Sequence, residues 1–111
     1  MEIRLMNQGN TLVVGVRGRL DSVTAAEFDR AMSEGVSNHE RRVILDFSEL
    51  DYMSSAGMRS LLVLQKRLEK QGGGLVVAGV KGLVNEVFVV SGFDSVLPVF
   101  ESLEAALASP R

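Results

Sequence analysis

The segment Asp51-Tyr52-Met53-Ser54-Ser55-Ala56-Gly57-Met58-Arg59 connects an apolar stretch, residues 43–47, to the clearest amphipathic pattern in the chain. Ser54 and Ser55 stand where the predicted helix begins. A helix N-terminus presents unpaired N–H groups and the positive end of the helix dipole, so it suits an anion or a phosphorylated side chain. Serine is also a common helix cap, and residue type alone favours that role. Any chemical site in this chain is expected here.

The helix after this turn is predicted from its two faces. Its apolar residues are Met58, Leu61, Leu62, Leu64 and Leu68, and its polar ones are Arg59, Lys66, Arg67, Glu69 and Lys70. Residues 71–74, Gln-Gly-Gly-Gly, end it. Residues 43–47 and 75–78 lack polar alternation, which is typical of strands covered on both faces.

The N-terminal third is predicted to form a hairpin and a helix. Residues 3–5 and 12–16 alternate in polarity, as strands do, and a turn at residues 7–10 separates them. Residues 18–21 then lead into a helix. Thr24 and Glu27 match a capping box, and Val23 and Phe28 have the spacing of a hydrophobic staple. Gly35 and the polar residues 37–40 end this helix, and Arg41-Arg42 precede the next strand.

The last third is predicted to contain a helix over residues 83–90, a short strand over residues 96–100 and a terminal helix over residues 103–107. Gly92 fits the residue that ends the first of these helices, with Phe93 folding back on Phe88. Pro98 places the short strand at a sheet edge. The order β-β-α-β-α-β-α-β-α predicts one α/β domain over residues 1–111, with a mixed four- to five-stranded sheet and about four helices.

Composition excludes several classes of protein. The 111 residues are 46 % hydrophobic and 23 % charged, with a formal net charge of -2 and no cysteine. There is no global basic field to attract nucleic acid, and no disulfide or thiol chemistry. The N-terminus lacks the pattern of a signal peptide, and no apolar run is long enough to span a membrane. We expect a cytoplasmic protein that inserts into no membrane and binds no nucleic acid directly.

Enzymatic chemistry is not expected. The single histidine, His39, lies in a polar loop that the topology places at the opposite end of the sheet from Ser55, so a serine hydrolase would lack its base. No Gly-x-Ser-x-Gly elbow is present. One histidine with scattered carboxylates does not make a metal site, and residues 71–74 are not a phosphate loop. We therefore predict no cofactor and no metal.

What remains is a cluster of polar residues at one edge of the sheet. The second strand leads into Asp21, the third into Asp46, and the serine turn follows. Loops at the carboxyl ends of parallel strands are the usual location of function. Asp21 is equally well explained as a turn residue, and Asp46 as a hydrogen bonder at the end of its strand.

Four segments together resemble the STAS domain of bacterial anti-sigma factor antagonists. They are Gly18-Arg19-Leu20-Asp21 with Thr24-Ala25, Val43-Ile44-Leu45-Asp46-Phe47-Ser48, Tyr52-Met53-Ser54-Ser55-Ala56-Gly57-Met58, and Ser91-Gly92-Phe93. The resemblance covers essentially the whole chain. It implies a regulator that binds an anti-sigma factor serine kinase and so promotes sigma-factor-dependent transcription. The kinase phosphorylates the antagonist to release itself, and a serine phosphatase reverses the modification.

The resemblance also implies the roles of particular residues. The family motif is commonly Asp-Ser-Ser/Thr/Ala-Gly, which makes Ser55 the phosphoacceptor and Gly57 the glycine. Ser54 occupies the aspartate position, where we expect it to cap the helix, and it is a minor rival acceptor. The residues expected to contact the partner are Asp21, Ser54, Ser55, Gly57 and Met58, with Gly57 admitting a partner backbone. The departure at Ser54 leaves an alternative: a STAS subunit of an ABC-type transport system that is never phosphorylated.

Overall fold

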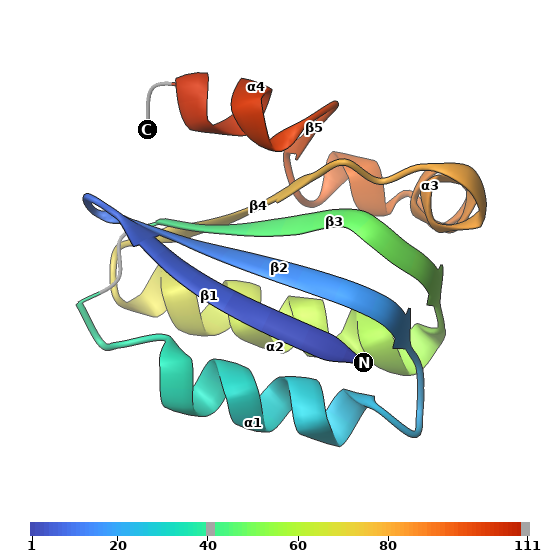
Figure 1. The fold of residues 1–111 in the computed structure, drawn as a ribbon, viewed down its shortest axis with the longest axis horizontal. Coiled ribbons are helices and arrows are strands. Elements are labelled where there is room, and N and C mark those ends of the chain that lie inside the picture. The colour runs from blue at the N-terminus through green and yellow to red at the C-terminus, as the bar shows by residue number, and fades with distance from the viewer. Residues whose placement is uncertain (40–41, 110–111) are drawn as a thin grey trace.

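The computed structural model describes residues 1–39 and 42–109 (Figure 1). Glu40 and Arg41, which the sequence places just before the third strand, lie outside the described residues, as do residues 110–111. The elements are β1 (Glu2–Gln8), β2 (Thr11–Leu20), α1 (Ala25–Gly35), β3 (Arg42–Met53), α2 (Ser55–Lys70), β4 (Gly74–Ala78), α3 (Gly82–Ser91), the short 3₁₀ helix η1 (Phe93–Ser95), β5 (Val99–Phe100) and α4 (Leu103–Ala108). The predicted order of strands and helices is confirmed.

The five strands form one sheet in the order β1-β2-β3-β4-β5. β1 is antiparallel to β2, and every other neighbouring pair is parallel, as predicted. β5 lies at the edge of the sheet, directly after Pro98, which agrees with the prediction of an edge strand. Only Val99 and Phe100 of the predicted strand over residues 96–100 belong to it.

β3 is longer than predicted, and this extension carries the site. The apolar pattern ends at Phe47, but the strand continues to Met53. Its pairing with β4 ends at Asp46, and from there to Met53 it pairs with β2 alone. Because this part has lost its neighbour on one side, it buries Phe47, Leu50 and Met53, while Ser48, Glu49, Asp51 and Tyr52 stay wholly or partly accessible.

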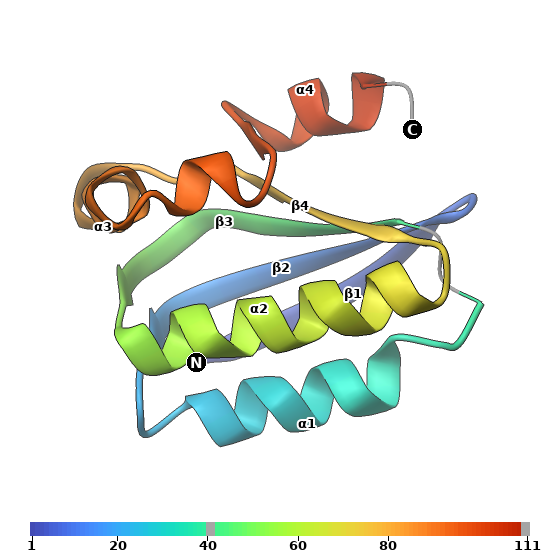
Figure 2. The ribbon, with the colours of Figure 1, turned by 180° about the vertical axis from the view of Figure 1, so that it is seen from behind.

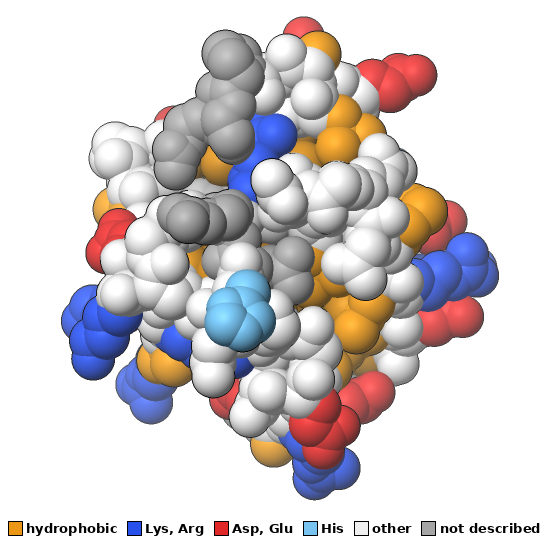
Figure 3. All heavy atoms as spheres, turned by 90° about the vertical axis from the view of Figure 1, so that its left-hand side faces the viewer, with side chains coloured by type: hydrophobic (Ala, Val, Ile, Leu, Met, Phe, Trp, Pro, Cys, Tyr) orange, Lys and Arg blue, Asp and Glu red, His pale blue; other side chains and the backbone are white. Residues whose placement is uncertain are grey.

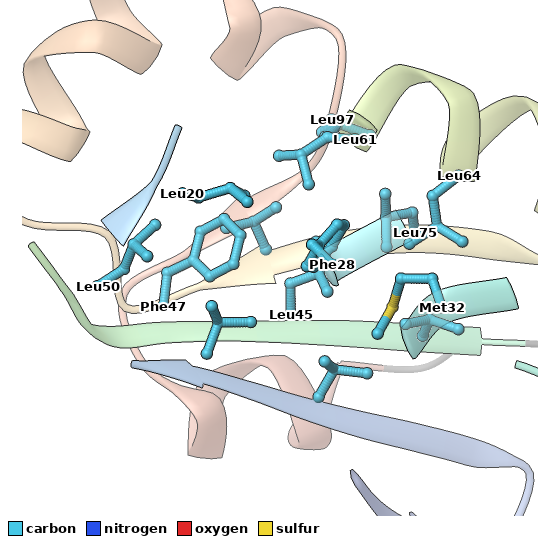
Figure 4. Packing of buried hydrophobic residues seen from close by; sticks show 14 of the residues in the cluster. Leu20, Phe28, Met32, Leu45, Phe47, Leu50, Leu61, Leu64, Leu75 and Leu97 are labelled. Atoms are coloured by element: carbon cyan, nitrogen blue, oxygen red, sulfur yellow. The ribbon is translucent and has the colours of Figure 1, made fainter. Parts of the chain in front are cut away.

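The helices lie on both faces of the sheet (Figures 1 and 2). α1 and α2 lie side by side on one face, and α4 covers the other, where Ala106 packs with Ile44 and Ala78. α3 packs against β3. The main core lies between the sheet and α1, α2 and α3 (Figure 4). Its largest side chains include Phe28, Phe47, Phe88, Leu20, Leu45, Leu50, Leu61 and Leu68.

The start of α1 differs from the prediction. Thr24 is the N-cap residue but has helical backbone angles and makes no side-chain cap hydrogen bond, so the capping box with Glu27 does not form. Its hydroxyl instead donates to the carbonyl of Arg19 (2.8 Å) and accepts from the N–H of Asp21 (2.9 Å). Val23 is 84 % exposed, so it does not form the predicted staple with the buried Phe28.

Arg67 also departs from its predicted place on the solvent side of α2. It is half-buried, and its guanidinium donates to the carbonyls of Met32 (3.1 Å) and Val36 at the end of α1. A helix C-terminus carries unpaired carbonyls and a partial negative charge. A cation from the neighbouring helix can donate hydrogen bonds to these carbonyls and also offset the charge. The long arginine stem can cover apolar surface while its charged head reaches these carbonyls.

The end of α3 is as predicted. Gly92 has φ 76°, a left-handed conformation that glycine adopts without strain, and ends the helix. Phe93 folds back so that its ring meets that of Phe88 edge-on, with centroids 5.3 Å apart.

Candidate functional site: the paired ends of β2 and β3

The candidate site is built by two strand ends that lie next to each other. Leu20 at the end of β2 pairs with Met53 at the end of β3. The N–H of Ser54 donates to the carbonyl of Leu20 (3.0 Å), so the first residue after β3 is tied to the last residue of β2. The loop that begins at Asp21 and the start of α2 therefore lie at the same edge of the sheet, as the topology predicted.

The two serines of the turn have different environments. Ser55 is the first residue of α2 and is exposed. Ser54 is the N-cap, but its Oγ is buried and has no hydrogen-bond partner among the described residues. It does not form the predicted side-chain cap, since its backbone is held by Leu20 and its hydroxyl is turned into the molecule. α2 thus begins without a serine cap and without an acidic residue in its first turn.

Gly57 is buried inside the domain. A Cβ built on it would lie 2.8 Å from Leu20 Cγ and 2.9 Å from the Leu20 carbonyl oxygen. The close approach that requires glycine here is therefore between α2 and β2, and not the predicted approach of a partner backbone. Met58 is half-buried and packs against the core while keeping part of its surface accessible.

Asp21 organises the loop between β2 and α1. Its Oδ1 accepts hydrogen bonds from the N–H groups of Val23 (3.0 Å) and Thr24 (3.1 Å), and its Oδ2 lies 3.4 Å from Arg19 Nε. The pKa of Asp21 is held below its ordinary value, mainly by the hydrogen bond from the Thr24 N–H, although burial acts in the opposite direction. Asp21 thus has the turn role that the sequence left open, and its partner contact stays a prediction.

A further pair at this edge was not found from the sequence. The guanidinium of Arg19 lies over the ring of Tyr52, with its Cζ 4.2 Å from the ring centroid. Arg19 and Tyr52 are opposite each other in the register of β2 and β3. The contact follows from the extension of both strands, because the sequence pattern alone ends β2 and β3 before these residues.

Asp46 does not belong to this edge, contrary to prediction. It lies within β3, seven residues before the strand ends, because β3 is longer than its apolar pattern. Its Oδ1 accepts from the N–H of Ser48 (3.1 Å), and it lines a hollow with Gly79, Lys81 and the start of α4. Asp46 is thus a hydrogen bonder within its strand.

His39 lies in the exposed loop after α1, at the end of the molecule opposite the candidate site (Figure 3). Among the described residues, no group of three or more histidine, aspartate or glutamate side chains could hold a metal ion. No helix in the described part of the chain is long and apolar enough to cross a membrane.

Comparison with known proteins assigns the fold and its family. The model of the STAS domain family matches residues 2–106. The protein named "Putative anti-sigma factor antagonist BtrV" from Bordetella bronchiseptica is 38 % identical over 98 % of this chain and 94 % of its own length. The anti-sigma F factor antagonist of Paenibacillus polymyxa is 24 % identical over 96 % of this chain and 92 % of its own.

A solved structure supports the assignment of the fold. The crystal structure of an anti-sigma factor antagonist from Mycobacterium paratuberculosis matches with a TM-score of 0.86 and 24 % identity, covering 96 % of this chain and 90 % of the other. The five-stranded mixed sheet with its helices is thus a STAS fold. The chain belongs to the STAS domain family and, within it, to the anti-sigma factor antagonists.

Proposed function

We propose that this protein is an anti-sigma factor antagonist controlled by phosphorylation of Ser55. In its unphosphorylated form it binds an anti-sigma factor serine kinase through the edge formed by Asp21, the serine turn and Met58. The kinase then no longer holds its sigma factor, and transcription dependent on that factor rises. The protein acts by binding in the cytoplasm and is not itself an enzyme.

The observation that carries the proposal is the contrast between the two serines. A kinase must reach the hydroxyl that it modifies. Ser55 is exposed at the first position of α2, whereas Ser54 Oγ is buried. This contrast favours Ser55 over Ser54 as the acceptor and agrees with the position that the family motif predicts.

The partner enzymes, and not this chain, catalyse the addition and removal of the phosphate. The kinase transfers the γ-phosphoryl group of ATP to Ser55 Oγ, and ADP and the hydroxyl proton leave. A serine phosphatase later hydrolyses the ester to restore the hydroxyl and release inorganic phosphate. On this chain, the only histidine lies at the far end of the sheet from Ser55, which supports a role as substrate and not as a serine hydrolase.

Phosphorylation changes binding more than folding. It adds about -1.5 to -2 charges at a helix N-terminus, where the dipole and unpaired N–H groups accommodate an anion. A partner surface packed over Ser55 would instead face a new anion beside the carboxylate of Asp21. A loss of about 3 kcal/mol of binding free energy weakens the complex more than a hundredfold, which is sufficient for a switch.

The test is a binding and phosphorylation assay with the cognate anti-sigma factor kinase. Incubation with the kinase and ATP should place one phosphate on Ser55, mapped by mass spectrometry. Ser55→Ala should bind the kinase and resist phosphorylation, and Ser55→Glu should bind at least tenfold more weakly. Ser54→Ala is the matched control and should still be phosphorylated at position 55.

No phosphate at Ser55, together with unchanged binding by Ser55→Glu, would overturn the proposal. Co-purification with an ABC-type ATPase, and not with a kinase, would favour the transport-subunit alternative that Ser54 raises.

A further inference from the structure

Arg59 is an exposed cation that has no anionic partner among the described residues. It lies on α2, and it takes part in no ion pair or hydrogen bond of its side chain among the described residues. No aspartate or glutamate occurs between Asp51 and Glu69, so α2 offers Arg59 no anion within two turns. An exposed cation of this kind has its full charge available to a new anion.

Arg59 is also placed to reach Ser55. The two residues are four positions apart on one helix, and both are exposed. Residues at this spacing are neighbours on the helix surface, with Cβ atoms about 5 to 6 Å apart. An anion that precedes a cation by four residues is the favourable orientation, because the helix dipole also favours the anion at the N-terminal position.

We propose that Arg59 binds the phosphate of phosphorylated Ser55 as an ion pair within α2. This inference rests on the proposed modification of Ser55. Arginine is suited to the role, since its planar guanidinium can donate two parallel hydrogen bonds to phosphate oxygens. Modification then changes the surface of α2 twice: it adds an anion at Ser55 and withdraws the Arg59 cation from any partner.

Other charged groups at this edge do not replace Arg59. Asp21 and Asp51, from the elements that precede α2, carry the same sign as the phosphate. Arg19 already lies against Asp21 and the ring of Tyr52. These groups are present in every variant compared below, so their effect on the phosphate cancels.

The experiment uses the full chain with phosphoserine inserted at position 55 during translation, which requires no kinase. The second pKa of the phosphate, about 6 in phosphoserine, is measured by ³¹P NMR titration at 0.1 M salt. An ion pair favours the dianion, so Arg59→Gln should raise this pKa by about 0.3 pH units. Arg59→Lys keeps the charge and should retain most of the original shift.

Lys66→Gln is the matched control on the same helix. Lys66 is exposed and lies eleven residues from Ser55, roughly 16 Å along the helix axis, which exceeds the screening length of about 10 Å. The Lys66→Gln variant should leave the second pKa of the phosphate unchanged. An unchanged pKa in Arg59→Gln, or an equal rise in Lys66→Gln, would overturn the ion pair.

The same phosphorylated protein separates this inference from the proposed function. If it binds the kinase as well as the unmodified chain, the proposed switch fails while the ion pair can still be observed. If binding is lost but the pKa does not respond to Arg59→Gln, only the ion pair fails.

Discussion

Gly57 lies so close to Leu20 that a Cβ on the glycine would sit 2.8 Å from Leu20 Cγ and 2.9 Å from the Leu20 carbonyl oxygen. That carbonyl oxygen also accepts a hydrogen bond from the N–H of Ser54. The first turn of α2 is therefore held against the end of β2 by a hydrogen bond and by direct packing. The position of Ser55 depends on this contact.

Replacing Gly57 with alanine should lower the free energy of unfolding by about 1 to 2 kcal/mol. Alanine favours a helix by about 1 kcal/mol, but overpacking a filled site costs about 1 to 3 kcal/mol, and here one of the contacted atoms is backbone. Urea denaturation measures the difference. Gly15→Ala is the control, since the nearest atom to its Cβ is 4.0 Å away, and it should not destabilise the protein. Equal stability of the two variants would contradict the contact.

Removing the Arg67 guanidinium should loosen the packing of α1 on α2. Arg67→Met keeps the apolar stem but leaves the carbonyls of Met32 and Val36 without this donor. Hydrogen bonds from charged groups contribute about 1.5 to 3 kcal/mol, so a loss of about 2 kcal/mol is expected. The neighbouring exposed Lys66→Met should change stability by less than about 0.5 kcal/mol. A loss as small for Arg67→Met as for Lys66→Met would show that these bonds contribute nothing.

The charge of Asp21 should make a pH-dependent contribution to stability. The pKa of Asp21 is lowered in the folded chain, so between the folded value and the unfolded value of about 3.9 the unfolded chain binds more protons. The contribution is complete above the unfolded value and is lost as the pH falls through the folded value. Asp21→Asn should therefore be less stable than the wild type at pH 7, and the difference should narrow below about pH 4. Urea denaturation of both proteins across this range measures it, and a difference that stays constant would refute the role of the charge.

The orientation of α3 predicts opposite results for two of its residues. Phe88 is fully buried against Phe93, so Phe88→Ala should cost about 3 to 5 kcal/mol of stability. Val90 is 87 % exposed, so Val90→Ala should change stability by less than about 0.5 kcal/mol. Thermal and urea denaturation should give this order, and a reversed order would mean that α3 presents another face to the core.

Most of the fold could be predicted from local pattern. Three signals act over a few residues of chain: the period of the apolar residues in α2, the lack of polar alternation at residues 43–47, and the glycine after α3. Together they predict the order of the elements and hence a mixed sheet. The Ser54-Ser55 turn also follows from local pattern, because it joins a strand to a helix.

The predictions for Thr24 and Arg67 were wrong for a common reason. Thr24 has the sequence of a capping box, but its hydroxyl hydrogen-bonds the backbone of Arg19 and Asp21, five and three residues earlier in the chain. Arg67 has the sequence position of a solvent-facing cation, but α1 presents carbonyls that need a donor. A residue pattern does not tell which of several possible partners, near in sequence for Thr24 or on another helix for Arg67, a polar group will bind.

By itself, therefore, the sequence determined the order of the elements, the sheet type and the turn that carries Ser55. Only the tertiary structure decided which serine is accessible, that Gly57 serves the contact with Leu20, and that Asp46 lies away from the site. These three features depend on the pairing of β2 with β3, which continues beyond the last residue that pairs with β4. The strands that pair are far apart in the sequence, so their hydrogen bonds leave little trace in composition or in the period of the apolar residues.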